Sequence, residues 1–177
     1  MLKILGGVAA TLIVVVVAAI GFAASQPDTF RVSRSIVIQA PPETIAAQVN
    51  DFRAWRAWSP FEQRDPDLQR AYSGAASGVG AVYAYKGDEQ VGAGRMEILE
   101  ASPQATLVDL QFRKPMKARN TATFHYEPEG AATRVTWQMD GDMPLIGKVM
   151  GLVFSMDAMV GKDFEQGLAN LKRVAEA

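Results

Sequence analysis

Hydrophobic and polar positions divide the chain into stretches with different periodicity. Residues 4–24 are uniformly apolar, residues 68–142 alternate between apolar and polar positions, and apolar residues from 144 onward recur at helical spacing. Alternation places successive side chains on opposite faces of a strand, whereas spacings of three and four place them on one face of a helix. The pattern therefore predicts an α+β protein that follows an apolar N-terminal segment.

A strand and a helical pair are predicted between the apolar segment and the alternating region. FRVSRSIVIQ, residues 30–39, is rich in Val and Ile, which is typical of a strand. In APPETIAAQVNDFRAW the early prolines and Glu43 indicate the start of a helix. Pro60 is expected to end the helical run near Trp58, because the residue before a proline is disfavoured in the α region.

The alternating region predicts a series of strands joined by short turns. The expected strands are residues 69–73, 80–86, 91–101, 105–113, 117–127 and 132–141. Such short connections favour an antiparallel meander, because parallel strands need long crossovers. Within the strand at 105–113, Val108 and Leu110 share one face while Asp109 and Gln111 share the other. One face of the sheet is therefore expected to be apolar and the other to meet water.

The C-terminal helical stretch has two unlike halves. Between residues 144 and 160 only Lys148 and Asp157 are charged, so this half is apolar nearly all round, while residues 161–177 are amphipathic. A helix that is apolar on every side must be buried, touch a membrane or cover a ligand. Its glycines each cost about 1 kcal/mol relative to alanine in a helix interior, which predicts a break or a mobile segment here.

The N-terminal segment predicts a transmembrane anchor. Residues 4–24 are 21 consecutive positions without a charge, and a helix of that length spans about 31 Å, the thickness of the bilayer hydrocarbon. A signal peptide is the alternative, because small residues follow at Ala23, Ala24 and Ser25. Its apolar region is usually about 7–15 residues long, which favours a retained anchor. We therefore expect an anchor or uncleaved signal at residues 1–25, a linker at 26–29 and one folded domain at 30–177.

Charges near the apolar segment do not settle its orientation. Lys3 precedes it and Arg31 and Arg34 follow it closely, so the positive-inside rule is indecisive. Because the head is short and weakly charged, we expect a single-pass membrane protein whose folded domain is extracytoplasmic.

Composition excludes several classes of function. With Lys3 set aside, 17 of the 18 Lys and Arg residues remain against 19 Asp and Glu, a net charge of −2, which argues against nucleic-acid binding. The chain has no cysteine and only one histidine, His125. Zinc, haem and Rieske-type iron sites therefore lack a ligand set, and no metal or cofactor is expected.

Three segments resemble a known superfamily. These are IQAPPETIAAQVNDFRAWRAWSPF, YSGAASGVGAVYAY with VGAGRMEI, and MDAMVGKDFEQGLANLK. Over about residues 30–175 the chain resembles the START-like or SRPBCC superfamily, and most closely its bacterial polyketide cyclase/dehydrase and lipid-transport group. The resemblance implies a helix-grip fold, in which a curved antiparallel sheet wraps around a long C-terminal helix and encloses an apolar cavity. It leaves the reaction open, because the superfamily includes lipid carriers, hormone receptors, aromatase/cyclases and subunits with iron centres.

Most of the candidate ligand site consists of aromatic and methionine residues that the alternation and the last helix would direct inward. The candidates are Trp55, Trp58, Phe61, Tyr83, Tyr85, Met96, Phe112, Phe124, Tyr126, Trp137, Met150, Phe154 and Asp157. The aromatic residues of WRAWSPF either fill the gap between helices and sheet or line the mouth of the cavity. A packed core without a cavity is the alternative for the whole set.

Charged residues near this set have their own alternatives. Asp157 either meets a cation such as Arg34, contacts ligand, or lies in water at a bend of the helix. Glu62, Asp65 and Asp67 share a polar loop with Arg64 and are expected to form a solvated rim. The basic hairpin at 113–119 is either a solvated turn or a surface for anionic head groups.

We therefore expect a membrane-anchored binding or carrier domain for an apolar or lipid-like small molecule, with residues 4–24 in the membrane. No catalytic constellation is identifiable. One alternative is an enzyme of the cyclase/dehydrase type that uses an inward polar cluster, for instance Arg34, Asp157 and Tyr126. Another is a scaffold whose apolar helix docks on a membrane protein.

Overall fold

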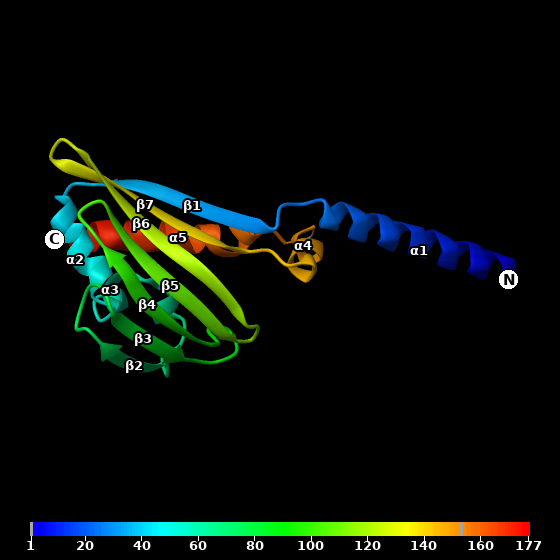
Figure 1. The fold of residues 1–177 in the computed structure, drawn as a ribbon, viewed down its shortest axis with the longest axis horizontal. Helices are drawn as coiled ribbons and strands as arrows, with labels where there is room; N and C mark the ends of the chain where they lie inside the picture. Colours follow the sequence, from blue (N-terminus) through cyan, green and yellow to red (C-terminus); the bar gives the residue numbers. More distant parts are fainter. Residues whose placement is uncertain (1, 153) are drawn as a thin grey trace.

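The computed structural model describes residues 2–152 and 154–177, with side chains from residue 13 onward. Helix α1 (Leu2–Ala24) extends away from a folded domain that runs from Thr29 to Ala175 (Figure 1). Within the described residues, no helix combines the length and the hydropathy that crossing a membrane requires. The predicted transmembrane helix at 4–24 includes residues 4–12, whose side chains lie outside the described part.

The folded domain contains one seven-stranded antiparallel sheet. Its strands are β1 (Thr29–Ile38), β2 (Gln69–Gly74), β3 (Ala81–Lys86), β4 (Ala93–Ala101), β5 (Ala105–Lys114), β6 (Ala118–Glu129) and β7 (Ala132–Asp142). The order in the sheet is β1-β7-β6-β5-β4-β3-β2, so β2 to β7 form the predicted meander and only β1 pairs out of sequence order. The α+β class and the antiparallel meander are thereby confirmed.

Short helices close one end of the sheet and a long helix crosses it. The short helices are α2 (Pro42–Asn50), α3 (Trp55–Trp58) and the 3₁₀ helix η1 (Pro60–Gln63). The C-terminal stretch forms α4 (Leu145–Gly151) and α5 (Met156–Ala175), and α5 lies along the concave side of the sheet beside β1 (Figure 1). Ser155 accepts a hydrogen bond from the backbone N–H of Ala158 at 3.1 Å, so a side-chain cap starts α5 anew after the break.

The core lies between the sheet and α5. The ring of Trp137 on β7 stacks on Phe164 of α5 with centroids 4.2 Å apart, and Phe124 of β6 stacks on its other side at 5.0 Å. A Cβ on Gly167 would lie 2.7 Å from the Trp137 ring, so the glycine allows the helix to approach the sheet this closely. This arrangement of curved sheet and gripped C-terminal helix fits the helix-grip fold.

Strand register gathers several connections at one end of the sheet. Thr29 pairs with Asp142, Phe112 pairs with Ala118, and Lys86 pairs with Ala93. The β3–β4 and β5–β6 hairpins therefore lie at the end from which the chain leaves for α1 and α4 (Figure 1). We call this the α1 end of the sheet; α2 and the C-terminus lie at the opposite end.

Candidate functional site

Most of the predicted ligand-site residues lie together in the aromatic core. The buried members are Trp55, Trp58, Tyr83, Met96, Phe124, Tyr126 and Trp137. Their rings meet mainly edge to face, as between Trp58 and Phe124 with centroids 5.9 Å apart. The side chains thus fill much of the space between the short helices, the sheet and α5.

The tryptophans of this cluster differ in how their indole N–H groups are satisfied. Trp55 donates to the carbonyl of Val49 at 2.8 Å, and Trp58 donates to the carbonyl of Gln48 at 3.3 Å. Both bonds fasten α3 to the end of α2, a structural role for the WRAW segment. The Nε1 of Trp137 is buried and has no hydrogen-bond partner among the described residues. A buried donor left unpaired costs about 1–3 kcal/mol, which a polar ligand atom would offset.

The concave face is less completely covered toward the α1 end of the sheet. Tyr85 of β3 and Phe112 of β5 are only half-buried there, although they face the same side as the buried core residues. Apolar residues of β5, η1 and α5 are also partly buried against this part of the core, namely Leu110, Phe61, Met156 and Val160. We call these six residues the open end of the concave face.

Tyr85 brings a polar group into this apolar surface. Burial raises the pKa of its hydroxyl to about 12. Its ring leans across β4, because Gly94 has no side chain to block it, and Gly94 also pairs with Phe112 on the next strand. The open end therefore combines an apolar wall with a neutral phenol, an arrangement suited to orienting an amphipathic molecule.

A buried polar cluster lies at the β2–β3 edge of the core. Glu62 of η1 accepts hydrogen bonds from the Arg70 guanidinium at 2.7 Å and from the hydroxyl of Tyr83. Burial, followed by the bond to Glu62, raises the pKa of Tyr83. Tyr72 stacks on Tyr83, and its buried hydroxyl has no partner among the described residues.

The expectation that Glu62, Asp65 and Asp67 form a solvated rim is therefore wrong for Glu62 and Asp65, which are buried, whereas Asp67 is exposed. Asp65 accepts hydrogen bonds from the backbone N–H groups of Asp67 and Asp88, each at 2.8 Å, and so ties the loop to the β3–β4 hairpin. Pro60 at the start of η1 was a signal that this loop is ordered, but the partners of Glu62 come from distant strands.

Asp157 contacts Arg34, the cation named in the sequence analysis. Its two carboxylate oxygens accept hydrogen bonds from Arg34 at 2.7 and 2.9 Å, and Arg34 also donates to Glu165 at 2.7 Å. The hydrogen bond from Arg34 holds the pKa of Asp157 below its ordinary value. The hydroxyl of Tyr126 instead bonds to Thr106, 2.9 Å away on β5. The structure thus joins Arg34 to Asp157 without adding Tyr126 to the pair.

Met150 and Phe154 lie outside the core. Their side chains are 50% and 65% exposed, on α4 and on the segment between α4 and α5. A hollow of about 490 Å³ lies beneath this region, between the end of α1, the start of β1 and the α4–α5 segment. Asp157 lines that hollow, whereas the aromatic candidates do not.

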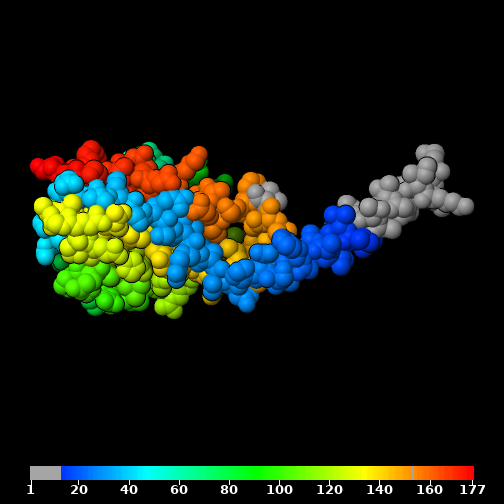
Figure 2. Space-filling model, turned by 90° about the horizontal axis from the view of Figure 1, so that it is seen from above, coloured from blue at the N-terminus to red at the C-terminus, as the bar shows by residue number. Residues whose placement is uncertain are grey.

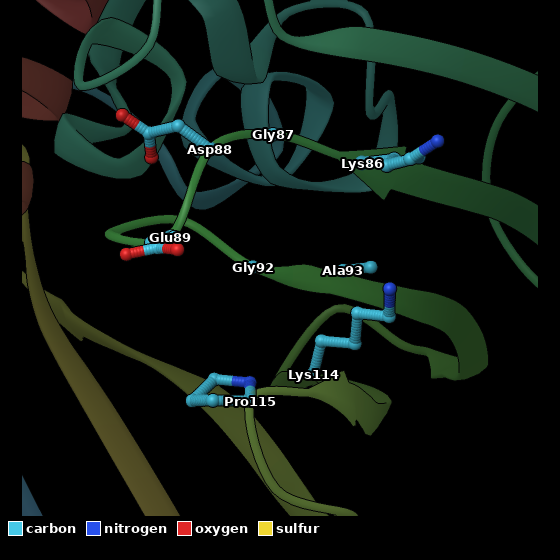
Figure 3. Close-up of a pocket in the computed structure, with 8 residues that line it drawn as sticks. All are labelled: Lys86, Gly87, Asp88, Glu89, Gly92, Ala93, Lys114 and Pro115. Carbon is cyan, nitrogen blue, oxygen red and sulfur yellow. The ribbon is translucent and has the colours of Figure 1, made fainter.

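A second hollow of about 570 Å³ opens between the β3–β4 and β5–β6 hairpins (Figure 3). It is lined by Lys86, Gly87, Asp88, Glu89, Gly92, Ala93, Lys114 and Pro115. None of the predicted site residues lines it, but it lies at the same end of the sheet as the open end of the concave face. Among the described residues, no group of three His, Cys, Asp or Glu side chains is arranged to hold a metal ion.

Comparison with known proteins agrees with this architecture. The model of the family described as polyketide cyclase/dehydrase and lipid transport matches residues 29–176. No curated protein sequence matches the chain.

Solved structures show the same fold at low sequence identity. The di-domain aromatase/cyclase BexL, from the BE-7585A biosynthetic pathway, is 15% identical with a TM-score of 0.62, over 88% of this chain and 52% of BexL. A Chromobacterium violaceum protein is 16% identical with a TM-score of 0.58, over 86% of this chain and 99% of its own. The Aha1 protein of Colwellia psychrerythraea, solved as a dimer, is 16% identical with a TM-score of 0.58, over 83% of this chain and 96% of its own.

Proposed function

The chain belongs to the polyketide cyclase/dehydrase and lipid transport family, and on that premise we propose that it is a membrane-anchored domain that binds or carries an apolar or lipid-like small molecule. The ligand would lie on the open end of the concave face, between the sheet and the first half of α5. Binding would depend on apolar burial, with a few polar groups that set the orientation of the ligand.

One observation carries this proposal. Apolar side chains of the concave face are buried by the short helices and α5 at the end where α2 lies, whereas at the α1 end they stay partly exposed. Phe112 and Tyr85 continue the rows of buried residues along β5 and β3, yet both remain partly exposed. Apolar surface left uncovered in a concave position gains by burial against a ligand, at about 25 cal/mol per Å². The open end is thus a place where a hydrocarbon chain or ring would be stabilised.

One polar group at the open end would orient the ligand. The hydroxyl of Tyr85 stays protonated at neutral pH and can donate a hydrogen bond. A molecule with an apolar body and an oxygen acceptor, such as a fatty acid or a polyketide, matches this arrangement.

The anchor is supported by residues 4–24, which carry no charge over a length that matches the bilayer core. In the proposed arrangement α1 holds the domain at the membrane, where apolar ligands concentrate, with the domain on the extracytoplasmic side. The α1 end of the sheet, which includes the open end of the concave face, would then face the bilayer.

The test uses residues 26–177, which include the whole stretch that the family model matches, purified without detergent. Mass spectrometry of an organic extract would identify a bound molecule, and a fluorescent fatty-acid analogue would report affinity. Phe112→Ala is expected to weaken binding of the analogue about tenfold, because it removes roughly 1.4 kcal/mol of apolar contact. Leu99→Ala, an equally conservative truncation of an exposed residue, is the control. Equal affinity of the two variants would refute a ligand at the open end.

The buried Glu62–Tyr83 pair favours a second candidate, an enzyme of the cyclase/dehydrase type. A carboxylate and a phenol joined by a hydrogen bond can pass a proton, and Arg70 fixes the carboxylate in place. On this proposal Glu62→Gln would abolish turnover of a poly-β-keto substrate analogue while leaving its binding intact. A carrier would show no turnover in either form.

A further inference from the structure

The α1 end of the domain carries a group of exposed apolar side chains. Helix α4 and the segment after it expose Ile146 and Phe154, each 65% accessible, and the β5–β6 hairpin exposes Met116 to 64%. The other exposed members are Leu145, Met150 and Leu152. Exposed clusters of large apolar residues are characteristic of surfaces that meet a membrane or a partner.

The register shows that the two parts of this group project in the same direction. Asn120 of β6 pairs with Gly141 of β7. From that row the β5–β6 hairpin continues outward to Met116, and the chain after β7 continues outward to α4. The start of β1 leaves the sheet at the same row, and Figure 2 shows α4 beside the segment that leads from α1 to β1. The exposed apolar residues of α4 therefore lie beside the base of α1, and Met116 lies at the same end of the sheet.

Helix α4 has only one charged residue, Lys148, whose side chain is 6% exposed while that of its partner Asp28 is 95% exposed. Lys148 is buried and donates to the carboxylate of Asp28 at 2.7 Å. The same hydrogen bond lowers the pKa of Asp28, and the two opposite charges compensate each other. The outer face of α4 therefore presents no charge, which would be costly to bring into a lipid layer.

Cations flank the apolar group. Arg113, Lys114 and Lys117 lie around the tip of the β5–β6 hairpin, are exposed, and form no ion pair within the described residues. Asp88 and Glu89 belong to the neighbouring hairpin, but Figure 3 shows their carboxylates directed away from the amino groups of Lys86 and Lys114. The β5–β6 tip thus offers three free cations beside exposed apolar side chains.

From these observations we infer that the α1 end of the domain is a docking surface for an anionic lipid bilayer. Ile146, Phe154 and Met116 would enter the boundary between head groups and acyl chains, while the cations of the hairpin would contact anionic head groups. This surface does not depend on α1 crossing the membrane. It would hold the open end of the concave face against the bilayer and give a lipid-like ligand a direct path into the domain.

The charge contribution is tested with residues 26–177 and sedimenting vesicles of phosphatidylcholine, with or without phosphatidylglycerol. The domain is expected to bind the anionic vesicles and to dissociate as salt is raised. Each cation near the surface contributes about fivefold, so Lys114→Glu with Lys117→Glu should weaken binding by roughly 30-fold or more. Arg56→Glu with Arg173→Glu reverses the same number of exposed charges away from the hairpin and should have little effect.

The apolar contribution is tested by Ile146→Ser with Phe154→Ser. This pair should remove the binding that persists at high salt, whereas Leu99→Ser with Val79→Ser, also exposed, should not. Circular dichroism confirms that each variant is folded. Failure of the wild-type domain to bind anionic vesicles would overturn the inference. Fatty-acid binding by the same protein is measured separately, so that result would leave the proposed ligand site standing.

Discussion

The hydroxyl of Tyr85 lies over the backbone of Gly94, so close that a Cβ on residue 94 would be 2.5 Å from the oxygen. Such a distance is well inside van der Waals contact, so any side chain at this position must displace the tyrosine or the strand. Gly94 also pairs with Phe112 on β5. One glycine thereby decides how the phenol is presented at the open end of the concave face.

We predict that Gly94→Ala disturbs this arrangement. Displacement of the Tyr85 ring should destabilise the domain by about 1–3 kcal/mol, the usual cost of overpacking. The pKa of Tyr85 should also fall from about 12 toward its ordinary value, because the moved ring is better solvated. Absorbance of ionised phenol, recorded against Tyr85→Phe in each background, measures the shift.

Gly151→Ala is the matched control for this variant, since a Cβ there meets no atom within 4 Å. It should not destabilise the domain. An unchanged Tyr85 titration in Gly94→Ala would mean that the glycine does not set the position of the phenol.

A second prediction compares Trp55, whose indole N–H has a hydrogen-bond partner, with Trp137, whose indole N–H has none among the described residues. Trp55→Phe removes the indole N–H that donates to the Val49 carbonyl, so this carbonyl loses a hydrogen bond. Trp137→Phe removes a buried N–H that has no partner among the described residues, so no hydrogen bond is lost. Both lose a similar apolar volume. Trp137→Phe should therefore cost less in the free energy of unfolding than Trp55→Phe, by about 1–3 kcal/mol.

Urea denaturation of the ligand-free domain compares these variants. Phe164 stacks on Trp137, and phenylalanine at 137 preserves an aromatic contact there. An equal or larger cost for Trp137→Phe would indicate that its N–H is satisfied in solution, for instance by water.

The strands were accessible from the sequence because their signal is local. Alternation with period two is a property of neighbouring residues, and it located the strand from residue 105 to within one residue of β5. The pairing of β1 with β7 depends on a partner about 100 residues away, so no local pattern in the sequence predicts it.

The first half of the C-terminal stretch shows why the site was harder to predict. One continuous helix would place Met150 and Phe154 on the stripe that includes Phe164. The structure breaks the helix before Ser155 and redirects α4, so that both residues are exposed. Gly161 causes no break within α5; it instead lets Arg34 approach, since a Cβ there would clash with the guanidinium.

Glu62 provides a third prediction, because its burial comes from contacts that sequence spacing does not show. The Glu62 and Arg70 side chains are 5% and 19% exposed, and Oε2 of Glu62 lies 2.7 Å from Nε of Arg70. Glu62→Gln leaves the arginine charge without its partner, which should destabilise the domain by about 3 kcal/mol, the lower end of the range for buried pairs.

Glu129→Gln is the control, because it breaks an ion pair with Arg134 of equal length whose side chains are both about 40% exposed. Such a surface pair contributes about 0–1 kcal/mol. Similar costs for the two glutamine variants, measured by urea denaturation, would contradict a special role for the buried pair.

The last prediction concerns acid stability and the Arg34–Asp157 contact between β1 and α5. The hydrogen bond from Arg34 lowers the pKa of Asp157 in the folded state relative to the unfolded chain. A carboxyl group shifted in this direction stabilises the fold above its unfolded pKa of about 4, and this contribution disappears as the pH falls through the folded pKa. Wild type should therefore be more stable than Asp157→Asn at neutral pH, and the difference should shrink below about pH 4. Urea midpoints of both proteins across that range measure the effect, with the exposed Glu100→Gln as control. Because Glu165 also contacts Arg34, α5 should stay docked on β1 in Asp157→Asn. If the difference in stability between the two proteins stays the same in acid, the Arg34–Asp157 ion pair is not its source.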